Sequence, residues 1–175
     1  DSIMKENPAK KKVRRTINTK DEADITRLTI ADFSAIHHRA GELGHVWMQI
    51  AMELSLQTSH AVLEISKLKY ADVEDYIKIQ RQKNKKKTAS RVLIPMNAEL
   101  ESLIFRSRND NILSPYVVHY MRKRKDQRRP LGKGLDHHTQ LRSDQISRVF
   151  SDIRDELGLF NDIDKRPDRP SFHDI

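Results

Sequence analysis

The sequence contains no cysteine, which excludes a disulfide framework and a thiolate metal site and makes the cytosol the simplest compartment to expect. No apolar run approaches the length of a membrane span, and a hydrophobic fraction of 37% beside a charged fraction of 33% is typical of a soluble globular chain. A secretory signal is missing too, and the first residue is Asp1 rather than Met. We therefore expect the chain to begin inside a longer protein.

Positive charge is what the chain has in excess, with a formal net charge of +8 and a pI of about 9.7. The basic residues are clustered, which suits a polyanion with closely spaced phosphates because each neutralised phosphate releases counterions. Composition alone leaves DNA, RNA, membrane headgroups and a merely solvated surface open. The clusters are Lys10, Lys11, Lys12, Arg14 and Arg15; Arg81, Lys83, Lys85, Lys86, Lys87 and Arg91; and Arg122, Lys123, Arg124, Lys125, Arg128 and Arg129.

The length of 175 residues suits one compact domain with an irregular terminal segment. Residues 1–27 have little apolar periodicity and carry the first basic cluster, so we predict a linker or basic arm there and a domain over 28–175. Thr29 followed by Asp32 has the form of a helix start and predicts a helix over about 30–42. Its expected apolar stripe is Ile30, Phe33, Ile36 and Leu43.

Apolar spacing predicts two more helices before the pattern changes. One carries Trp47, Ile50, Ala51 and Leu54 on one face, and a short one carries Ile65 and Leu68 after a break near Thr58 and Ser59. Two β-prone runs, 76–79 and 91–95, then flank a lysine-rich turn and predict a small antiparallel hairpin or three-stranded sheet.

Capping residues predict the remaining helices. Asn97 is expected to cap one helix, Ser114 and Pro115 to start a second that carries Tyr116 and Tyr120, and Ser143 to start a third that ends at Gly158. Residues 127–140 are expected to form a loop. The predicted fold class is therefore α+β, mainly α, with a small antiparallel sheet or hairpin.

Three segments, taken in this order, resemble the catalytic domain of tyrosine recombinases, particularly the lambda-type phage integrases. Residues 51–73 are similar to the family's T-G-x-R-x-x-E/D-L box with its trailing L-K/R-W-x-D-I. Residues 79–84 and 92–95 are similar to the hairpin that bears the catalytic lysine and to the strand after it. Residues 172–175, Phe-His-Asp-Ile, are similar to the start of the H-x-x-R box.

The resemblance implies DNA cleavage in which a tyrosine attacks the phosphodiester and leaves a 3′-phosphotyrosine and a free 5′ hydroxyl. Two arginines, a lysine and one or two histidines surround the phosphate, and neither a metal nor a cofactor is required. Lys83 matches the hairpin lysine and His173 the first residue of the histidine box. A shift in register would put Lys85, Lys86 or Lys87 in the place of Lys83, and the alternative for His173 is a terminal histidine without a partner.

Two departures from the family pattern bear on activity. Ala61 stands where the first catalytic arginine is expected, and the sequence has no arginine between Arg39 and Arg81, so His60, a lysine from elsewhere or nothing takes its place. The chain ends at Ile175, before the expected second arginine and the nucleophilic tyrosine. We therefore predict that this chain by itself does not cleave DNA.

No other residue is assigned to the chemistry. Tyr70, Tyr76, Tyr116 and Tyr120 do not match the nucleophile, and the remaining histidines are expected to be surface or structural residues. His137 and His138 lack acids or thiols at ligand spacing, so no metal site is expected. The residues expected to contact DNA phosphates are Arg81, Lys85, Lys86, Lys87, Arg91, Lys123, Arg124 and Arg142.

Three hypotheses follow for function. The first is a site-specific recombinase domain that binds double-stranded DNA, assembles on it as a homotetramer and acts in the cytoplasm of a bacterial or phage-infected cell. The second is a catalytically impaired DNA-binding relative, which Ala61 favours. The third is an unrelated basic helical nucleic-acid-binding module, which the absence of a sheet between residues 51 and 97 would support.

Overall fold

The computed structural model describes residues 27–81, 91–121, 130–164 and 168–175. Helix α1 (Ile30–Glu42) begins at Thr29, whose hydroxyl accepts a hydrogen bond from the Asp32 amide while the Asp32 carboxylate accepts one from the Thr29 amide. This capping box confirms the predicted helix start. Ile36 is buried in the core, but Ile30 is 89% exposed and Leu43 is 40% exposed. The predicted stripe was wrong at both of its ends, because Ile30 is the first residue of the helix and Leu43 is its C-cap residue.

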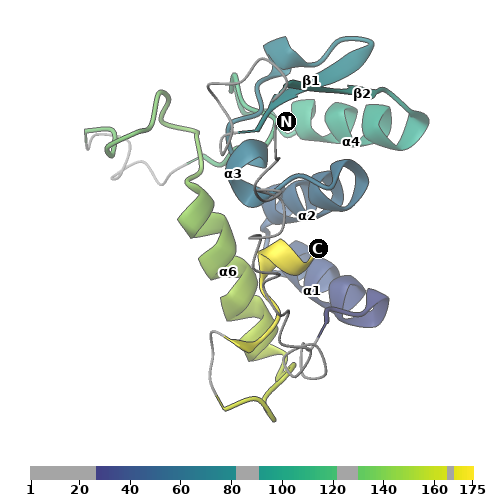
Figure 1. Cartoon of the computed structure of the whole chain (residues 1–175). Coiled ribbons are helices and arrows are strands. Elements are labelled where there is room, and N and C mark those ends of the chain that lie inside the picture. Colours follow the sequence, from purple (N-terminus) through teal and green to yellow (C-terminus); the bar gives the residue numbers. More distant parts are fainter. Residues whose placement is uncertain (1–26, 82–90, 122–129, 165–167) are drawn as a thin grey trace, which may run out of the picture.

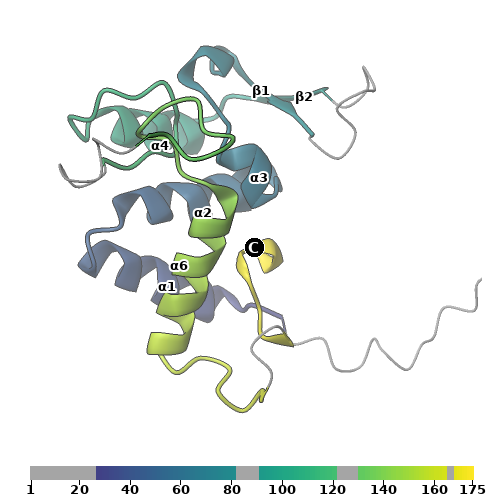
Figure 2. The ribbon, with the colours of Figure 1, turned by 90° about the vertical axis from the view of Figure 1, so that its left-hand side faces the viewer.

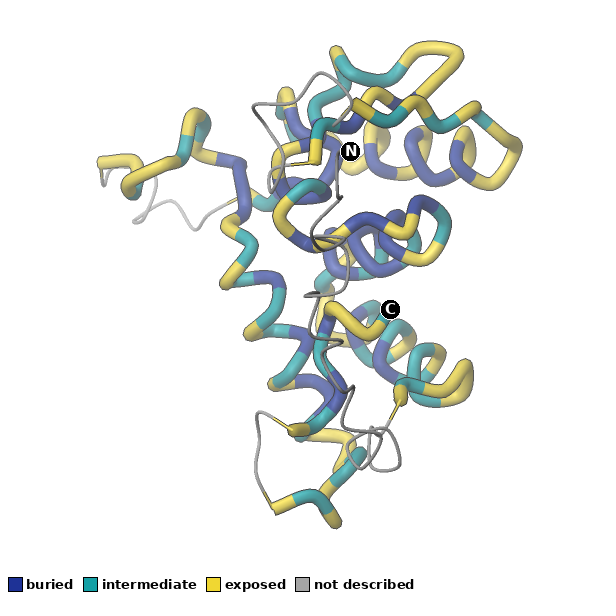
Figure 3. Tube along the Cα trace, in the orientation of Figure 1, coloured by how far each residue is buried: buried dark blue, intermediate teal, exposed yellow. Residues whose placement is uncertain are grey.

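Helix α2 (Val46–Thr58) is the centre of the packing, with α1, α3 (Val62–Ile65), α4 (Ala98–Arg108) and α6 (Ser143–Glu156) all in contact with it. Most of its residues are buried, as the dark-blue middle of the stack in Figure 3 shows. Such all-round burial fits a helix with little amphipathic contrast. It ends as predicted near Thr58, because Ser59 adopts a left-handed conformation with φ of 52°.

Polar contacts of one carboxylate join the three helices α1, α2 and α4 on their half-exposed side. Glu53 of α2 lies 2.8 Å from His37 Nε2 and pairs with Arg106 of α4. Burial by itself would raise the pKa of Glu53, but the hydrogen bonds from Arg106 and His37 outweigh it and hold the pKa below its usual value. The carboxylate is therefore held in its charged form, which keeps Arg106 and His37 bound to it.

Helix α6 crosses the stack, running beside α1, α2 and α3 in Figure 1. Its buried face carries Ile146, Phe150 and Ile153, as the sequence predicts, and Gly158 follows its end with φ of 70°. The short 3-10 turn η6 (Phe172–Asp174) packs back against α6 through Phe172. The C-terminal residues of the chain are thereby brought onto the body of the molecule.

The sheet consists, in the described residues, of two antiparallel strands, β1 (Tyr76–Gln80) and β2 (Arg91–Pro95). Ile77 and Ile79 point into the core while Leu93 is 60% exposed, so one face of the hairpin packs against the body. Figure 2 shows the two strands projecting from the upper part of the molecule. The α+β, mainly α fold with a small antiparallel sheet is confirmed.

Helix α4 begins at its N-cap Asn97 as predicted, and the Asn97 side chain accepts a hydrogen bond from the Leu100 amide at 2.8 Å.

The helix predicted to start at Ser114 and Pro115 was wrong. The segment is extended, and its backbone bonds to distant segments: the Tyr70 amide donates to Pro115 O at 2.9 Å, and the Val117 amide donates to Leu68 O at 3.0 Å. His119 forms a bridge to Gln140 in the same way. Backbone pairing with residues far along the chain outweighs the local start signal here.

Candidate nucleic-acid interface

Ala61, the position at which the resemblance calls for arginine, lies in the short link between α2 and α3. It is the N-cap residue of α3, with φ of −70° and ψ of 158°, and it is exposed. The side chain contributes a single methyl group at a surface that any residue type could occupy. The α2–α3 link therefore presents no cationic group at this position.

His60 does not replace the missing arginine in this conformation. Only 5% of it is exposed, its Nδ1 lies 2.7 Å from Thr58 O, and Nε2 is buried without a hydrogen-bond partner among the described residues. A ring nitrogen beside a carbonyl oxygen must carry the proton, so Nδ1 donates to Thr58 O. Neither nitrogen is placed to meet a DNA phosphate.

The hairpin carries those residues of the second basic cluster that the structure describes. Arg81 follows β1, Arg91 opens β2 opposite Gln80, and both arginines are exposed. Lys83, Lys85, Lys86 and Lys87 lie outside the described residues. Two adjoining pockets lie against the half of the strands nearest the turn, and their lining mixes charges: Glu64, Lys67, Asp72, Lys78, Gln80 and Arg91. Because carboxylates lie beside the cations, these pockets alone are not anion-binding sites.

His173 lies in η6 and is exposed. Ser171 and Asp174 form a capping box around this turn, with the Ser171 amide donating to the Asp174 carboxylate at 2.6 Å. Phe172 is 1% exposed and packs edge-on against Phe150 of α6, with ring centroids 5.7 Å apart. The two neighbours of His173 are thus fixed while its own ring faces outward.

Of the other residues predicted to contact DNA, Arg142 is exposed at the N-cap of α6, whereas Lys123 and Arg124 lie outside the described residues.

Figure 2 shows the η6 turn, α3 and the hairpin along one side of the molecule. The three predicted active-site segments, which are spread between positions 61 and 173 of the sequence, therefore share one side of the fold. That arrangement is what a single phosphate-binding site would require.

Tyr70 and Tyr116 are both held in their neutral form. Burial raises the pKa of Tyr70, whose hydroxyl lies 2.7 Å from Ser107 Oγ. Burial and the neighbouring Asp136 carboxylate raise the pKa of Tyr116 to about 12, and its hydroxyl donates to Asp136 Oδ2 at 3.3 Å. Neither phenol is prepared to act as a nucleophile, as the sequence predicts.

The raised pKa of Tyr116 predicts a loss of stability in alkali. The unfolded chain releases the proton near pH 10.0 and the folded chain near 12, so the stabilisation is complete below pH 10.0 and is lost as the pH rises toward 12. Urea unfolding across that range should show a steeper decline for the native sequence than for Tyr116→Phe. Equal slopes for the two proteins would contradict the assignment.

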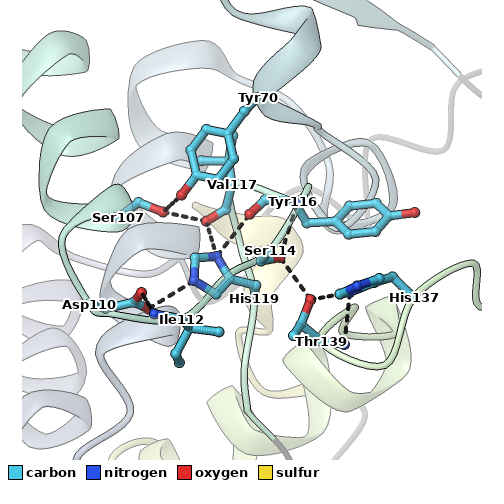
Figure 4. Close-up of polar contacts among 10 residues, drawn as sticks. All are labelled: Tyr70, Ser107, Asp110, Ile112, Ser114, Tyr116, Val117, His119, His137 and Thr139. Carbon is cyan, nitrogen blue, oxygen red and sulfur yellow. Dashed lines mark hydrogen bonds and ion pairs between the residues drawn. The ribbon is translucent and has the colours of Figure 1, made fainter.

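Sequence reasoning missed a buried polar cluster centred on His119 (Figure 4). His119 Nδ1 lies 2.8 Å from Tyr116 O and Nε2 lies 2.8 Å from Asp110 Oδ2, while Ser107 Oγ donates to Val117 O. The cluster fixes the extended segment against the end of α4. No local pattern marks it, because its members come from positions 107 to 119 and meet only after the segment has docked.

Curated relatives are integrases. The chain is 26% identical to the Integrase of Escherichia phage HK022 over 176 residues, which cover 100% of this chain and 44% of that protein. It is 28% identical to the Prophage integrase IntE of Escherichia coli (strain K12) over 136 residues, or 74% of this chain and 33% of that protein. The chain thus spans less than half the length of either relative. No known family profile matches the sequence.

Solved structures share the fold. The lambda integrase catalytic core matches with a TM-score of 0.62 and 22% identity, over 85% of this chain and 77% of that one. A lambda integrase bound to DNA matches with a TM-score of 0.61 and 22% identity, over 85% and 47%. XerA recombinase matches with a TM-score of 0.53 and 13% identity, over 85% and 47%. The sheet lies between α2 and α4 in the chain, so the absence that would support the third hypothesis, an unrelated helical module, is not found. No helix in the described ranges is long and apolar enough to cross a membrane.

Proposed function

We propose that this chain is a member of the tyrosine recombinase, or phage integrase, family, that it binds double-stranded DNA and that it contributes to site-specific recombination. The observation that carries the proposal is a sequence match to an integrase over the whole chain, together with the fold of an integrase catalytic core. The shared side of η6, α3 and the hairpin supports it, because these segments carry the expected phosphate-binding positions. Assembly as a tetramer on DNA and a cytoplasmic location are part of the same proposal.

The proposed chemistry is strand cleavage and rejoining in the complete protein. A tyrosine oxygen attacks the phosphorus, the bond to the 5′ oxygen breaks, and Lys83 gives that oxygen its proton, so the phosphodiester energy is kept in a 3′-phosphotyrosine. His173 would contact the same phosphate from η6. A free 5′ hydroxyl then reverses the step on another strand. The tyrosine and the second arginine are residues that the resemblance places after Ile175.

A catalytically impaired DNA-binding relative is the second candidate, and the exposed methyl group of Ala61 favours it. A suicide DNA substrate, nicked so that the cleaved strand diffuses away, separates the two. The full-length protein should form a covalent adduct that survives a denaturing gel if it is an active recombinase. Free DNA alone, with binding intact, would establish the impaired relative instead.

DNA binding by this chain should weaken with salt in proportion to the number of phosphates that its cations neutralise. Replacing Lys85, Lys86 and Lys87 together by glutamine should reduce the slope of log affinity against log salt by about one unit for each phosphate that is no longer neutralised. The measurement is a fluorescence-anisotropy titration of a short duplex at several salt concentrations. Arg148→Gln is a suitable control, because Arg148 is an exposed cation on α6 that pairs with Asp144 at 3.4 Å. An unchanged slope in the triple variant would remove the hairpin turn from the interface.

A further inference from the structure

The last turn of α6 contains a charged side chain that is buried. Arg154 is 1% exposed and is the largest fully buried side chain in the described part of the molecule. Arginine is almost never buried unless it is paired. A buried ion pair is also weak evidence of net stabilisation, because desolvation offsets most of the attraction. The position of this guanidinium therefore calls for a geometrical explanation.

The guanidinium of Arg154 joins α6 to the segment that carries His173. Its Nε and one terminal nitrogen donate to Asp155 Oδ1 at 2.9 and 2.6 Å, and the other terminal nitrogen donates to the carbonyl oxygen of Pro170. Arg169 approaches the same carboxylate oxygen at 3.3 Å and donates from Nε to Ile163 O at 2.9 Å. One carboxylate thus orients two guanidinium groups, and one of them holds the backbone three residues before His173.

Apolar packing also holds residues 170–175 in place. Phe172 packs against Phe150, and the Ser171–Asp174 capping box is internal to the turn, so it fixes the shape of the turn but not its position on α6. Phe172 belongs to the hydrophobic core, Pro170 is buried and Ile175 packs partly against the same core, so apolar contacts hold the turn on the body. The bond from Arg154 to Pro170 O adds a directional polar contact to this packing.

We propose that Arg154 is a positioning residue that fixes the orientation of His173 through the Pro170 carbonyl. This role rests on the proposed function, in which His173 contacts the DNA phosphate. The planar guanidinium of Arg154 uses two donors toward Asp155 and one toward the Pro170 carbonyl. The single ammonium group of a lysine cannot reproduce both directions. Lysine at this position should therefore restore charge but not orientation.

The experiment compares Arg154→Met and Arg154→Lys with the native chain by NMR. In both variants the amides of residues 172–174 should exchange about tenfold faster or more, as expected when a charge-assisted hydrogen bond is removed. The His173 ring signals should shift or broaden, and the amides of Ile146 and Phe150 should not change. Arg39→Met is the matched control, because Arg39 pairs with Glu156 at the same end of α6 without touching residues 170–175. It should leave His173 unchanged.

The native chain provides a measurement that does not depend on a variant folding. The terminal Arg154 N–H that donates to the Pro170 carbonyl and the amides of His173 and Asp174 should be protected from exchange to the same extent, because one opening event exposes them all. Protection of that terminal N–H with unprotected amides would overturn the proposal. So would an Arg154 variant that loses stability while its His173 signals and amide exchange stay native.

Adding a short duplex DNA separates this proposal from the proposed function. The native chain should bind it with a change in the His173 ring signals, and Arg154→Met should bind with most of that change abolished. If the native chain binds no duplex, the DNA-binding proposal fails, while the exchange data still decide whether Arg154 orients the turn. Binding by Arg154→Met with a native His173 response would overturn the positioning role alone.

Discussion

Arginine introduced at position 61 is expected to raise the rate of DNA cleavage by the full-length protein by about a hundred- to a thousandfold, the usual effect of one preorganised charge donor. A guanidinium fork matches two phosphate oxygens and would stabilise the charge that develops at phosphorus. The backbone at Ala61 is extended and the residue is exposed, so the substitution should cost little folding free energy. The measurement is the rate of covalent adduct formation on a suicide duplex.

Ala98→Arg is the matched control for this substitution. It makes the same chemical change at an exposed position next to a helix start, but Ala98 follows the end of β2 that lies away from the hairpin turn. It should strengthen general DNA binding at most and leave the cleavage rate unchanged. Equal cleavage by Ala61→Arg and the native protein would mean that another cation already occupies the phosphate site or that Ala61 lies outside it.

Local signals in the sequence predicted most of the helices. Thr29 with Asp32 and Asn97 with Leu100 are contacts between residues three positions apart, so the chain needs no distant partner to form them. The hairpin was predicted for the same reason, since its two β-prone runs are close in sequence. Burial of α2 on nearly all sides, by contrast, depends on four neighbouring elements.

The segment after Ser114 shows where local reasoning fails. Ser114 followed by Pro115 resembles a helix start, and the Ser114 hydroxyl does accept a hydrogen bond from the Tyr116 amide at 3.1 Å. The chain nevertheless continues as an extended segment, because Tyr116 pairs with Lys69 and His119 pairs with Gln140. Those partners are separated from it by some twenty to fifty positions, a range at which sequence patterns carry no information.

The residues of the candidate site also differ in whether the sequence could predict them. Resemblance assigned His173 and Ala61, and the fold places their segments on one side with the hairpin. Arg154 could not be found from the sequence, because an arginine in the last turn of a helix is expected at the surface, where it favours the helix dipole. Its burial follows from the return of Pro170 onto α6, which the sequence does not encode locally.

Phe150→Ala is expected to lower the free energy of unfolding by about 3–5 kcal/mol, as for other buried phenylalanines whose removal leaves a cavity. Phe150 is fully buried on α6 and also supports Phe172, so the substitution removes core packing and one attachment of the His173 turn together. Urea unfolding followed by circular dichroism measures the change. Phe105→Ala makes the same substitution at a residue of α4 that is 65% exposed, and it should change stability by less than about 0.5 kcal/mol.

Combining Phe150→Ala with Phe172→Ala tests whether the two rings act as one unit. Because each ring supports the other, the double variant should be destabilised by less than the sum of the two single variants, with a coupling of about 0.5–1.5 kcal/mol for an edge-on pair. The bond from Arg154 to Pro170 O would remain as a polar attachment of the turn, so the amides of residues 172–174 should keep part of their protection in Phe172→Ala. Strict additivity would mean that the turn is held without the aromatic pair, and that α6 and the His173 segment are stabilised independently.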